Sequence, residues 1–327
     1  MIEQYNLLEV EKLSLGFGGG NGLLRSQPAM ILRDVSFTIG QGEIIGLVGE
    51  SGSGKSTIGK AVLKLLKAQE GRIRFDGVDI SDLSEHDMRP LRREMQIVFQ
   101  DPYSSLDPRQ TVRGILSDAL DIHRLHTGTA REPRLVELLD MVGLRREFLD
   151  RYPHEFSGGQ RQRIGIARAM SVEPRLIVAD EPVSALDVSI QAQVINLIAR
   201  LRDQTGVSVL FISHDLSVVR FISDRIIVLY LGKIMEVGPA DLVHHAPLHP
   251  YSKALVSAEP RLDQKSSRIR LTGDIPSPLK PPSGCVFRTR CPFALPACAE
   301  GVPELREVAP GRSKACIRDD IDMETAA

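Results

Sequence analysis

The sequence predicts an α/β fold built around a mostly parallel sheet. Short apolar runs alternate with segments of helical spacing along most of the first 240 residues, which is the pattern of a parallel sheet with connecting helices. A glycine-rich turn and a pair of carboxylates each follow directly after an apolar run. Ligands in such folds bind at the carboxyl ends of the strands, so we expect both segments to lie in a site.

The individual elements follow from the same pattern. The predicted strands are 43–48, 176–179, 207–212 and 225–230, and the predicted helices are about 55–66 and 190–202. Helical patterns dominate between about residues 101 and 172, which suggests a helical subdomain beside the sheet.

The composition changes after about Gly238. His244, His245 and His249 lie in a proline-containing stretch that we expect to be a loop, and residues 276–282 (PSPLKPP) have the composition of a stiff linker. We therefore predict a core domain over residues 1–240 and a small cysteine-containing extension over residues 241–327.

Charge and apolar content restrict the location and the partners. The 327 residues include 41 basic and 42 acidic side chains, a balance that gives no long-range field toward nucleic acid or anionic lipid. The segment that begins at Met1 lacks the basic and apolar regions of a secretory signal. The longest apolar runs are too short to cross a bilayer, so a role at a membrane requires a partner.

Residues 49–57 (GESGSGKST) fit the phosphate-loop pattern G-x-x-x-x-G-K-[ST] between a predicted strand and a predicted helix. The glycines let backbone N–H groups point at phosphates, and the helix start adds positive potential. Lys55 would reach the β- and γ-phosphates of ATP, and Ser56 would bind Mg²⁺. The other members of the loop are Gly49, Glu50, Ser51, Gly52, Ser53, Gly54 and Thr57. The alternative is a glycine-rich turn without a ligand.

A carboxylate pair ends the apolar run 176–179. Asp180 is expected to hold Mg²⁺ through water, and Glu181 to activate the attacking water as a general base. An acidic pair at a strand end is usually only solvated, but the phosphate loop upstream favours the functional interpretation.

Ser157, Gly158, Gly159 and Gln160 precede a basic amphipathic helix. A serine followed by two glycines at a helix start is a second candidate anion site; the alternative is a capped helix. Since one nucleotide needs one such device, the second would serve a nucleotide held by another subunit.

These four residues resemble the signature motif of ABC ATPases, and further segments resemble the other motifs of that family in order. Gln100 resembles the glutamine that senses Mg²⁺ and the membrane subunit, residues 184–187 (SALD, ending at Asp187) resemble the loop that crosses the dimer seam, and His214 resembles the histidine that contacts the γ-phosphate. Phe17 is placed like the aromatic residue that stacks on adenine, although it could simply anchor a strand. The resemblance covers about residues 7–240 and implies a P-loop NTPase core of the ABC type.

Other stretches resemble the oligopeptide/dipeptide permease importers. They are residues 101–108 (DPYSSLDP, with Asp107 where that subfamily usually has asparagine), 249–255 (HPYSKAL) and the tail from residue 275. The resemblance implies an ATPase at the cytoplasmic face of the plasma membrane, paired with a second ATPase subunit, two permeases and a substrate-binding protein. Relatives import dipeptides, oligopeptides, glutathione or nickel chelates, and the second ATPase could be a copy or a paralogue.

The four cysteines, Cys285, Cys291, Cys298 and Cys316, are separated by five, six and seventeen residues. In a reducing compartment such a cluster suggests a metal site, either zinc or a [4Fe–4S] cluster, and the simpler alternative is four reduced thiols. Nearby basic residues could offset the charge of four thiolates: Arg288, Arg290, Arg312 and Lys314. The family resemblance implies an iron–sulfur cluster in some members and thus favours that prediction.

The sequence disfavours three rival functions, because it has one cassette, a near-zero net charge, both Glu181 and His214, and the importer-like tail. An ABC ATPase acting on nucleic acid would be expected to show a basic surface and two cassettes, an inactive cassette would lack Glu181 or His214, and an exporter would lack the importer-like tail.

Overall fold

The computed structural model describes residues 5–18, 29–259 and 269–321. The four amino-terminal residues used in the argument about a secretory signal lie outside these ranges. The chain forms two compact units, and each is described by itself. Unit 1 contains residues 1–5, 40–43 and 82–212, and unit 2 contains residues 6–39, 44–81 and 213–327.

Unit 1 contains a parallel sheet with helices. Its strands are β6 (Met95–Val98), β7 (Leu176–Asp180) and β8 (Ser208–Ser213), in the order β8-β7-β6. Every residue of β7 and β8 is buried, as in parallel sheets that are covered on both faces. This part of the chain confirms the predicted α/β class.

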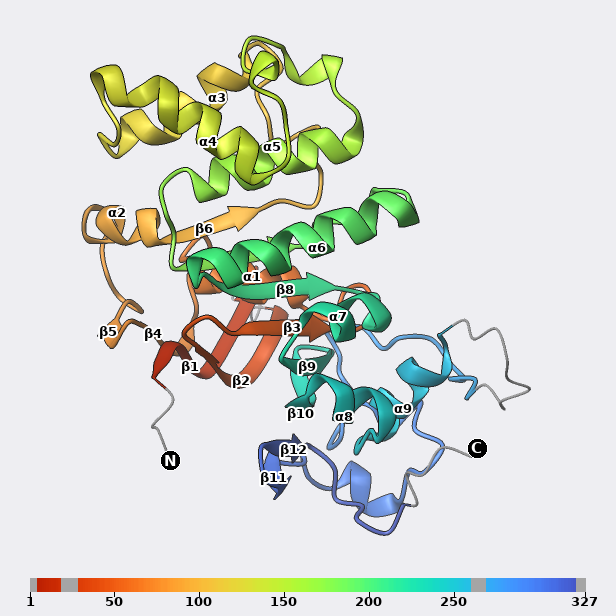
Figure 1. Ribbon diagram of the computed structural model, residues 1–327. Helices are drawn as coiled ribbons and strands as arrows, with labels where there is room; N and C mark the ends of the chain where they lie inside the picture. The colour runs from red at the N-terminus through yellow and green to blue at the C-terminus, as the bar shows by residue number, and fades with distance from the viewer. Residues whose placement is uncertain (1–4, 19–28, 260–268, 322–327) are drawn as a thin grey trace. The chain divides into compact units, whose positions relative to one another are not determined.

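Helices make up most of the rest of unit 1. They are α2 (Glu85–Glu94), α3 (Val112–Ile122), α4 (Arg131–Met141), α5 (Gly158–Met170) and α6 (Val188–Thr205), with short 3-10 turns at Gly128–Ala130, Arg146–Phe148 and Pro153–Glu155. Helix α5 packs against α3, α4, α6 and β6 (Figure 1). Helices α3, α4 and α5 all fall within the stretch where helical patterns dominate the sequence.

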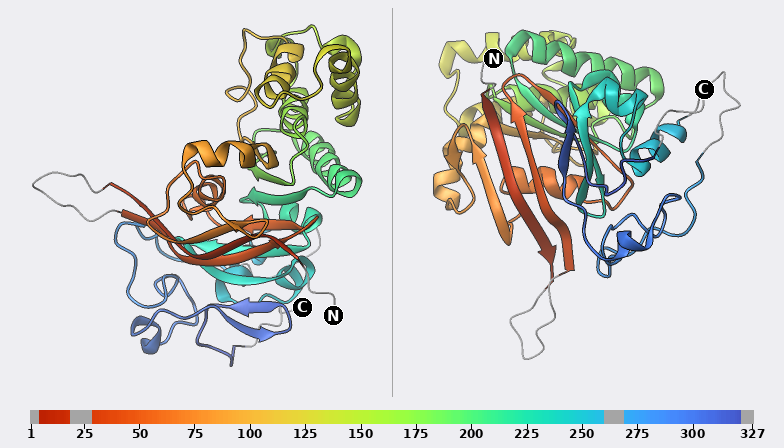
Figure 2. Two further views of the ribbon diagram at one scale, coloured as in Figure 1. Left: turned by 90° about the vertical axis from the view of Figure 1, so that its left-hand side faces the viewer. Right: turned by 90° about the horizontal axis from the view of Figure 1, so that it is seen from below.

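Unit 2 contains two sheets. One has the order β11-β12-β10-β9-β3 and is formed by β3 (Ile44–Val48), β9 (Arg225–Tyr230), β10 (Lys233–Pro239), β11 (Arg306–Ala309) and β12 (Arg312–Lys314). Strands β3 and β9 pair in parallel, whereas the other pairs are antiparallel. The other sheet has the order β2-β1-β4-β5 and is formed by β1 (Asn6–Phe17), β2 (Ala29–Gly40), β4 (Glu70–Phe75) and β5 (Val78–Asp79). Figure 2 shows the long strands β1 and β2 side by side; the sequence analysis did not predict them.

The helices of unit 2 are α1 (Lys55–Val62), α7 (Leu216–Ile222), α8 (Ala240–His245) and α9 (Pro250–Ser257), with a 3-10 turn at Pro296–Ala299. Helix α1 is shorter than predicted because Lys64 has a φ of 54° and donates its N–H to the carbonyl of Ala61, which ends the helix. The predicted loop at His244 and His245 is wrong, since both residues close α8.

A buried polar cluster connects the C-terminal strands to the centre of unit 2. Glu236 of β10 is fully buried and accepts N–H hydrogen bonds of 2.9 Å from Leu248 and His249. Arg312 of β12 lies 3.5 Å from the same carboxylate. His249 is 1% exposed, and its Nδ1 accepts the N–H of Tyr251 at the start of α9.

His249 should make the stability of the protein depend on pH. Burial, together with the charge of Lys314, lowers the pKa of His249 to about 3. Because the unfolded imidazole titrates near 6.5, only the unfolded state gains this proton as the pH falls from about 6.5 toward 3. We expect His249→Asn, which keeps an acceptor for Tyr251, to remove a loss of about 1.4 kcal/mol in unfolding free energy per pH unit below about 6. Urea unfolding of both proteins at several pH values measures this difference, and parallel pH curves would contradict it.

Candidate functional site

The glycine-rich loop joins β3 to α1 in unit 2. Gly52 and Gly54 have φ values of 79° and 105°, left-handed conformations that glycine adopts without steric cost. A Cβ at Gly49 would lie 2.1 Å from a backbone carbonyl oxygen of β9, so no larger residue fits there. Ser51 is exposed and Ser53 is buried. Each glycine of the motif thus has a local structural reason.

Lys55 begins α1, and its amine lies against the loop. The residue is 4% exposed, and Nζ donates to the carbonyl oxygens of Gly49 (2.8 Å) and Glu50 (3.0 Å). Ser56 and Thr57 follow in the first helical turn and are half-buried. A buried amine, a helix start and oxygen-bearing side chains together are suited to phosphates and Mg²⁺.

The carboxylate pair lies at the carboxyl end of β7 in unit 1. Asp180 is 7% exposed. Glu181 has a φ of 47°, and its N–H donates to the carbonyl of Ile212. A non-glycine residue in this conformation costs about 1–3 kcal/mol and is often found where a side chain must be aimed.

The structure brings Gln100 and Glu181 together. Gln100 follows β6, whose Val98 is in register with Ala179 of β7, so the two strands end side by side. The amide Nε2 of Gln100 donates to Oε2 of Glu181 at 3.2 Å. Two residues predicted separately therefore form one polar pair.

Ser157 and Gln160 form a reciprocal cap at the start of α5. The Ser157 hydroxyl accepts the N–H of Gln160, and the Gln160 side chain accepts the N–H of Ser157 at 3.1 Å. This capping box fixes the helix start. It does not test the anion site predicted at these residues, which stays a prediction.

Packing gives Gly159 a structural reason that the sequence analysis did not consider. A Cβ on Gly159 would lie 2.4 Å from Cγ2 of Ile190 in α6, and one on Gly158 would lie 3.3 Å from Leu186. The glycine pair thus lets α5 approach the start of α6. Asp187 is the exposed N-cap residue of α6.

His214 and Phe17 occupy exposed positions of unit 2. His214 follows β8 and precedes Asp215, whose carboxylate caps α7. Phe17 ends β1 and is 48% exposed. Among the described residues, no hydrogen bond or ring contact joins Phe17 to the glycine-rich loop.

Sequence reasoning missed two residues that contact the loop, Tyr251 of α9 and Arg290 of the cysteine segment. Both bind Glu50. No local pattern signals this, because each partner lies about two hundred residues or more along the chain.

The prediction of a metal site at the four cysteines is wrong. In the described part of the chain, no group of three or more His, Cys, Asp or Glu side chains is placed to hold a metal ion. Neither the [4Fe–4S] cluster nor its zinc alternative is therefore supported. All four cysteines are free, and three are buried.

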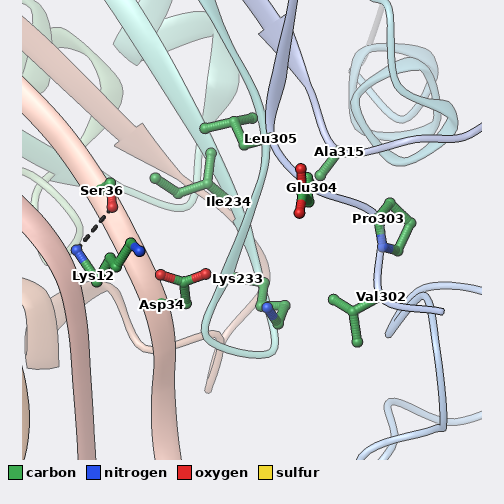
Figure 3. Close-up of a pocket in the computed structure, with 10 residues that line it drawn as sticks. All are labelled: Lys12, Asp34, Ser36, Lys233, Ile234, Val302, Pro303, Glu304, Leu305 and Ala315. Carbon is green, nitrogen blue, oxygen red and sulfur yellow. Dashed lines mark hydrogen bonds between the residues drawn. The ribbon is translucent and has the colours of Figure 1, made fainter.

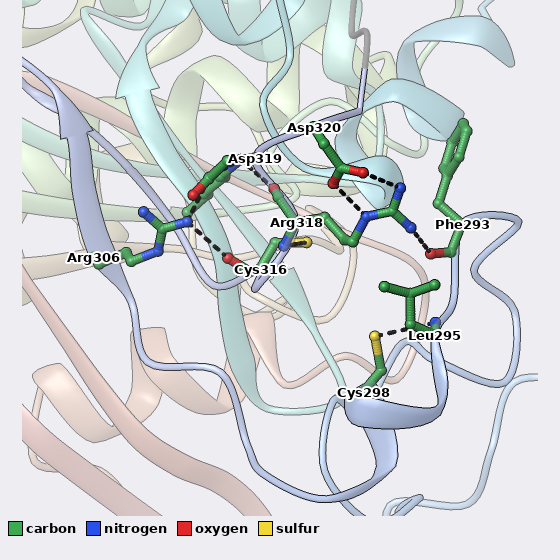
Figure 4. Close-up of polar contacts among 9 residues, drawn as sticks. Phe293, Leu295, Cys298, Arg306, Cys316, Arg318, Asp319 and Asp320 are labelled. Carbon is green, nitrogen blue, oxygen red and sulfur yellow. Dashed lines mark hydrogen bonds and ion pairs between the residues drawn. The ribbon is translucent and has the colours of Figure 1, made fainter.

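The cysteine side chains have local hydrogen bonds and buried positions in the extension. The sulfur of Cys298 accepts the N–H of Leu295, and that of Cys316 accepts the N–H of Arg318 (Figure 4). Burial raises the pKa of Cys291 to about 11 and also raises the pKa of Cys285.

The basic residues predicted to offset a cluster have other partners. Arg290 pairs with Glu50, Arg312 with Glu236, Lys314 with Asp319, and Arg288 with the carbonyl of Ser283. Arg318, which the sequence analysis did not consider, pairs with Asp320 and donates to the carbonyl of Phe293 (Figure 4).

A cavity of about 580 Å³ lies elsewhere in unit 2 (Figure 3). Its charged lining residues are Lys12, Asp34, Lys233 and Glu304. Ser36 accepts the N–H of Lys12 beside it. None of the residues predicted to bind nucleotide lines this cavity.

Comparison with known proteins identifies the family. A family model described as "ABC transporter" matches residues 32–184, and one described as "Oligopeptide/dipeptide transporter, C-terminal region" matches residues 235–298. A putative peptide import ATP-binding protein of Brucella ovis is 57% identical over 91% of this chain and 94% of its own length. The chain belongs to the ABC transporter family. Another relative of this ABC protein, the oligopeptide transport ATP-binding protein AppF of Bacillus subtilis, is 51% identical over 96% of the chain and 97% of its own length.

Solved structures confirm the ABC ATPase fold. The ATP-binding cassette MJ0796, solved as a dimer in a post-hydrolysis state with ADP and Pi, is 30% identical with a TM-score of 0.62, and the match covers 71% of this ABC protein and 98% of that chain. The protein cbiO1 of Clostridium perfringens is 26% identical with a TM-score of 0.62, over 73% and 90% of the two chains. Among the described ranges of this ABC protein, the helices are too short or too polar for a membrane crossing.

Proposed function

We propose that this chain is the ATP-hydrolysing subunit of an ABC importer that takes up peptides. The observation that carries the proposal is the succession of an ABC transporter match and an oligopeptide/dipeptide transporter match on one chain. Relatives named as peptide import or oligopeptide transport ATP-binding proteins, at 51–57% identity over more than nine-tenths of the chain, support it.

The proposed binding roles rest on the chemistry of the residues and, for Phe17 and Gln100, on the resemblance to ABC ATPases. Lys55 and the loop N–H groups bind the β- and γ-phosphates of ATP, and Phe17 stacks on adenine. Ser56, Asp180 and Gln100 hold Mg²⁺ directly or through water. Hydroxyl, carboxylate and amide oxygens are the hard donors that this cation prefers, so the residues present fit the ion.

In the hydrolytic step, Glu181 takes a proton from water as the water oxygen attacks the γ-phosphorus and the bond to ADP breaks. The hydrogen bond from Gln100 orients the carboxylate, and His214 contacts the γ-phosphate. Charge on the transferred phosphoryl group is stabilised by Mg²⁺ when it is bound and by Lys55.

We further propose that two ATPase subunits close around ATP. Residues 157–160 bind the nucleotide held by the partner subunit, and Asp187 lies at the seam. The start of α5 supports this role because its helix N-terminus attracts anions and Ser157 is exposed. The partner is a copy or a paralogue of this chain.

The remaining assignments concern the assembly. We propose that the chain binds two permease subunits at the cytoplasmic face of the plasma membrane, near Gln100 and the helical stretch 101–172, with a substrate-binding protein delivering the solute. Residues 1–240 form the nucleotide-binding domain, and residues 241–327 form the extension.

Peptide uptake tests the proposal. In cells whose own copy of this chain is deleted, we expect the wild-type chain to restore uptake of a labelled dipeptide or oligopeptide, and Glu181→Gln not to, because closure without hydrolysis stalls transport. The matched control is Glu147→Gln, an exposed carboxylate of the same unit, which should restore uptake fully. If the deleted cells still take up peptides but no longer take up a nickel chelate or glutathione, the transported substrate is that solute and not a peptide.

A further inference from the structure

Glu50, the second residue of the glycine-rich loop, is held at three points. Its N–H donates to the hydroxyl of Tyr251 at 2.9 Å, and its carbonyl oxygen accepts from Nζ of Lys55 at 3.0 Å. Its two carboxylate oxygens accept from the two terminal nitrogens of Arg290, at 2.5 and 3.0 Å. The planar guanidinium thus makes the bidentate pair that is the strongest form of this interaction.

An aromatic cluster holds Arg290 in this position. Tyr230, Tyr251 and Phe287 pack with ring centroids 4.8 to 5.2 Å apart, and each ring is at most 1% exposed. Nη1 of Arg290 also donates to the Tyr230 hydroxyl at 3.3 Å. The guanidinium is therefore fixed by packing as well as by charge.

The Glu50–Arg290 pair is partly shielded from water. The Arg290 side chain is 8% exposed and that of Glu50 is 23% exposed. Removing one partner from such a pair leaves the other charge less well solvated than at the surface, which costs more than breaking an exposed pair.

The position of Glu50 gives this pair a consequence for nucleotide binding. A carboxylate in the loop that binds phosphate would repel a polyanion at short range, and the repulsion is strong where water is scarce. The guanidinium cancels that charge and keeps the carboxylate turned toward the aromatic cluster. Tyr251 fixes the N–H of the same residue, so the loop backbone is held from the same side.

We propose that Arg290 and Tyr251 of the C-terminal extension are positioning residues that neutralise and orient Glu50, and so set the affinity of the loop for ATP. The inference rests on the proposed ATP-binding function. It makes the extension a part of the nucleotide site, a role distinct from both the metal site and the linker suggested by the sequence.

Nucleotide titration of the full chain tests this role, with a fluorescent ATP analogue and Mg²⁺ as the probe. We expect Arg290→Met to raise the dissociation constant at least about tenfold, because Glu50 is left unpaired. Adding Glu50→Gln to that variant should bring it back to within about threefold of wild type, since the two residues act as one unit. The matched control is Arg318→Met, which removes a bidentate guanidinium of the same extension that pairs with Asp320 and should change nothing.

Each outcome of the titration either supports or overturns the role proposed for Arg290. An unchanged dissociation constant in Arg290→Met would overturn the proposal. So would a loss of ATP affinity that Glu50→Gln does not relieve. If that unrelieved loss comes with a matching fall in Tm, the role of Arg290 is purely structural. If Arg290→Met does not fold, Arg290→Lys serves as the second variant, because it keeps the charge without the planar guanidinium. We expect it to raise the dissociation constant by a smaller factor, and an unchanged dissociation constant would overturn the proposal. Failure of the wild-type chain to bind the analogue would instead refute the proposed ATPase function.

Discussion

Glu181→Gln should bind ATP with nearly wild-type affinity while its hydrolysis rate falls by about 10²–10⁴-fold. The amide keeps the size of the carboxylate but cannot take a proton from water. The strained backbone at residue 181, with a φ of 47°, is left unchanged by this substitution. Single-turnover hydrolysis of radiolabelled ATP, together with equilibrium binding, separates the chemical step from affinity.

Two comparisons sharpen this experiment. Glu147→Gln removes an exposed carboxylate of the same unit and should leave the rate unchanged. Gln100→Ala removes the hydrogen-bond donor to Glu181 and should reduce the rate by a smaller factor. Rapid hydrolysis by Glu181→Gln would rule out residue 181 as the general base.

Lys55→Ala should weaken ATP binding by roughly tenfold to a hundredfold. This factor corresponds to the free energy of about 1.5–3 kcal/mol that a hydrogen bond to a charged group contributes. The substitution removes the buried amine that donates to the carbonyls of Gly49 and Glu50. The loop therefore loses its own internal contacts as well as a cation for the phosphates. Titration of the full chain with labelled ATP measures the effect.

Lys60→Ala provides the matched control for this variant. Lys60 lies on the same helix but is exposed, so its loss should not alter affinity. A normal dissociation constant in folded Lys55→Ala would contradict the assignment of residues 49–57 as the phosphate loop.

Features that depend on local backbone geometry were predictable from the sequence. Gly52 and Gly54 are required by their positive φ, and Gly49 by a close carbonyl. The glycines in the sequence motif therefore indicate the backbone conformation of the loop. Asp180 ends a strand whose residues are all buried, and Glu181 follows it; the apolar run 176–179 indicates such a strand. Parallel pairing of β6 and β7 then accounts for the contact of Glu181 with Gln100.

Features that depend on distant residues were not predictable. The charges of Arg290 suggested a role near the cysteines, but its carboxylate partner is 240 residues away along the chain. The clustering of the cysteines suggested a shared ligand, whereas two of the sulfurs accept hydrogen bonds from nearby backbone N–H groups. Spacing along the sequence does not reveal which of these arrangements the fold selects.

The pairing of β12 with β10 has a practical consequence for dividing this protein. In the sheet, Glu236 and Val237 of β10 lie opposite Lys314 and Ser313 of β12. A chain shortened at about residue 240 would expose β10 as an unprotected edge, with backbone groups free to recruit a strand from another molecule. It would also leave the buried Glu236 carboxylate without Arg312. Self-association of such a fragment would then be a property of the cut rather than of the ATPase.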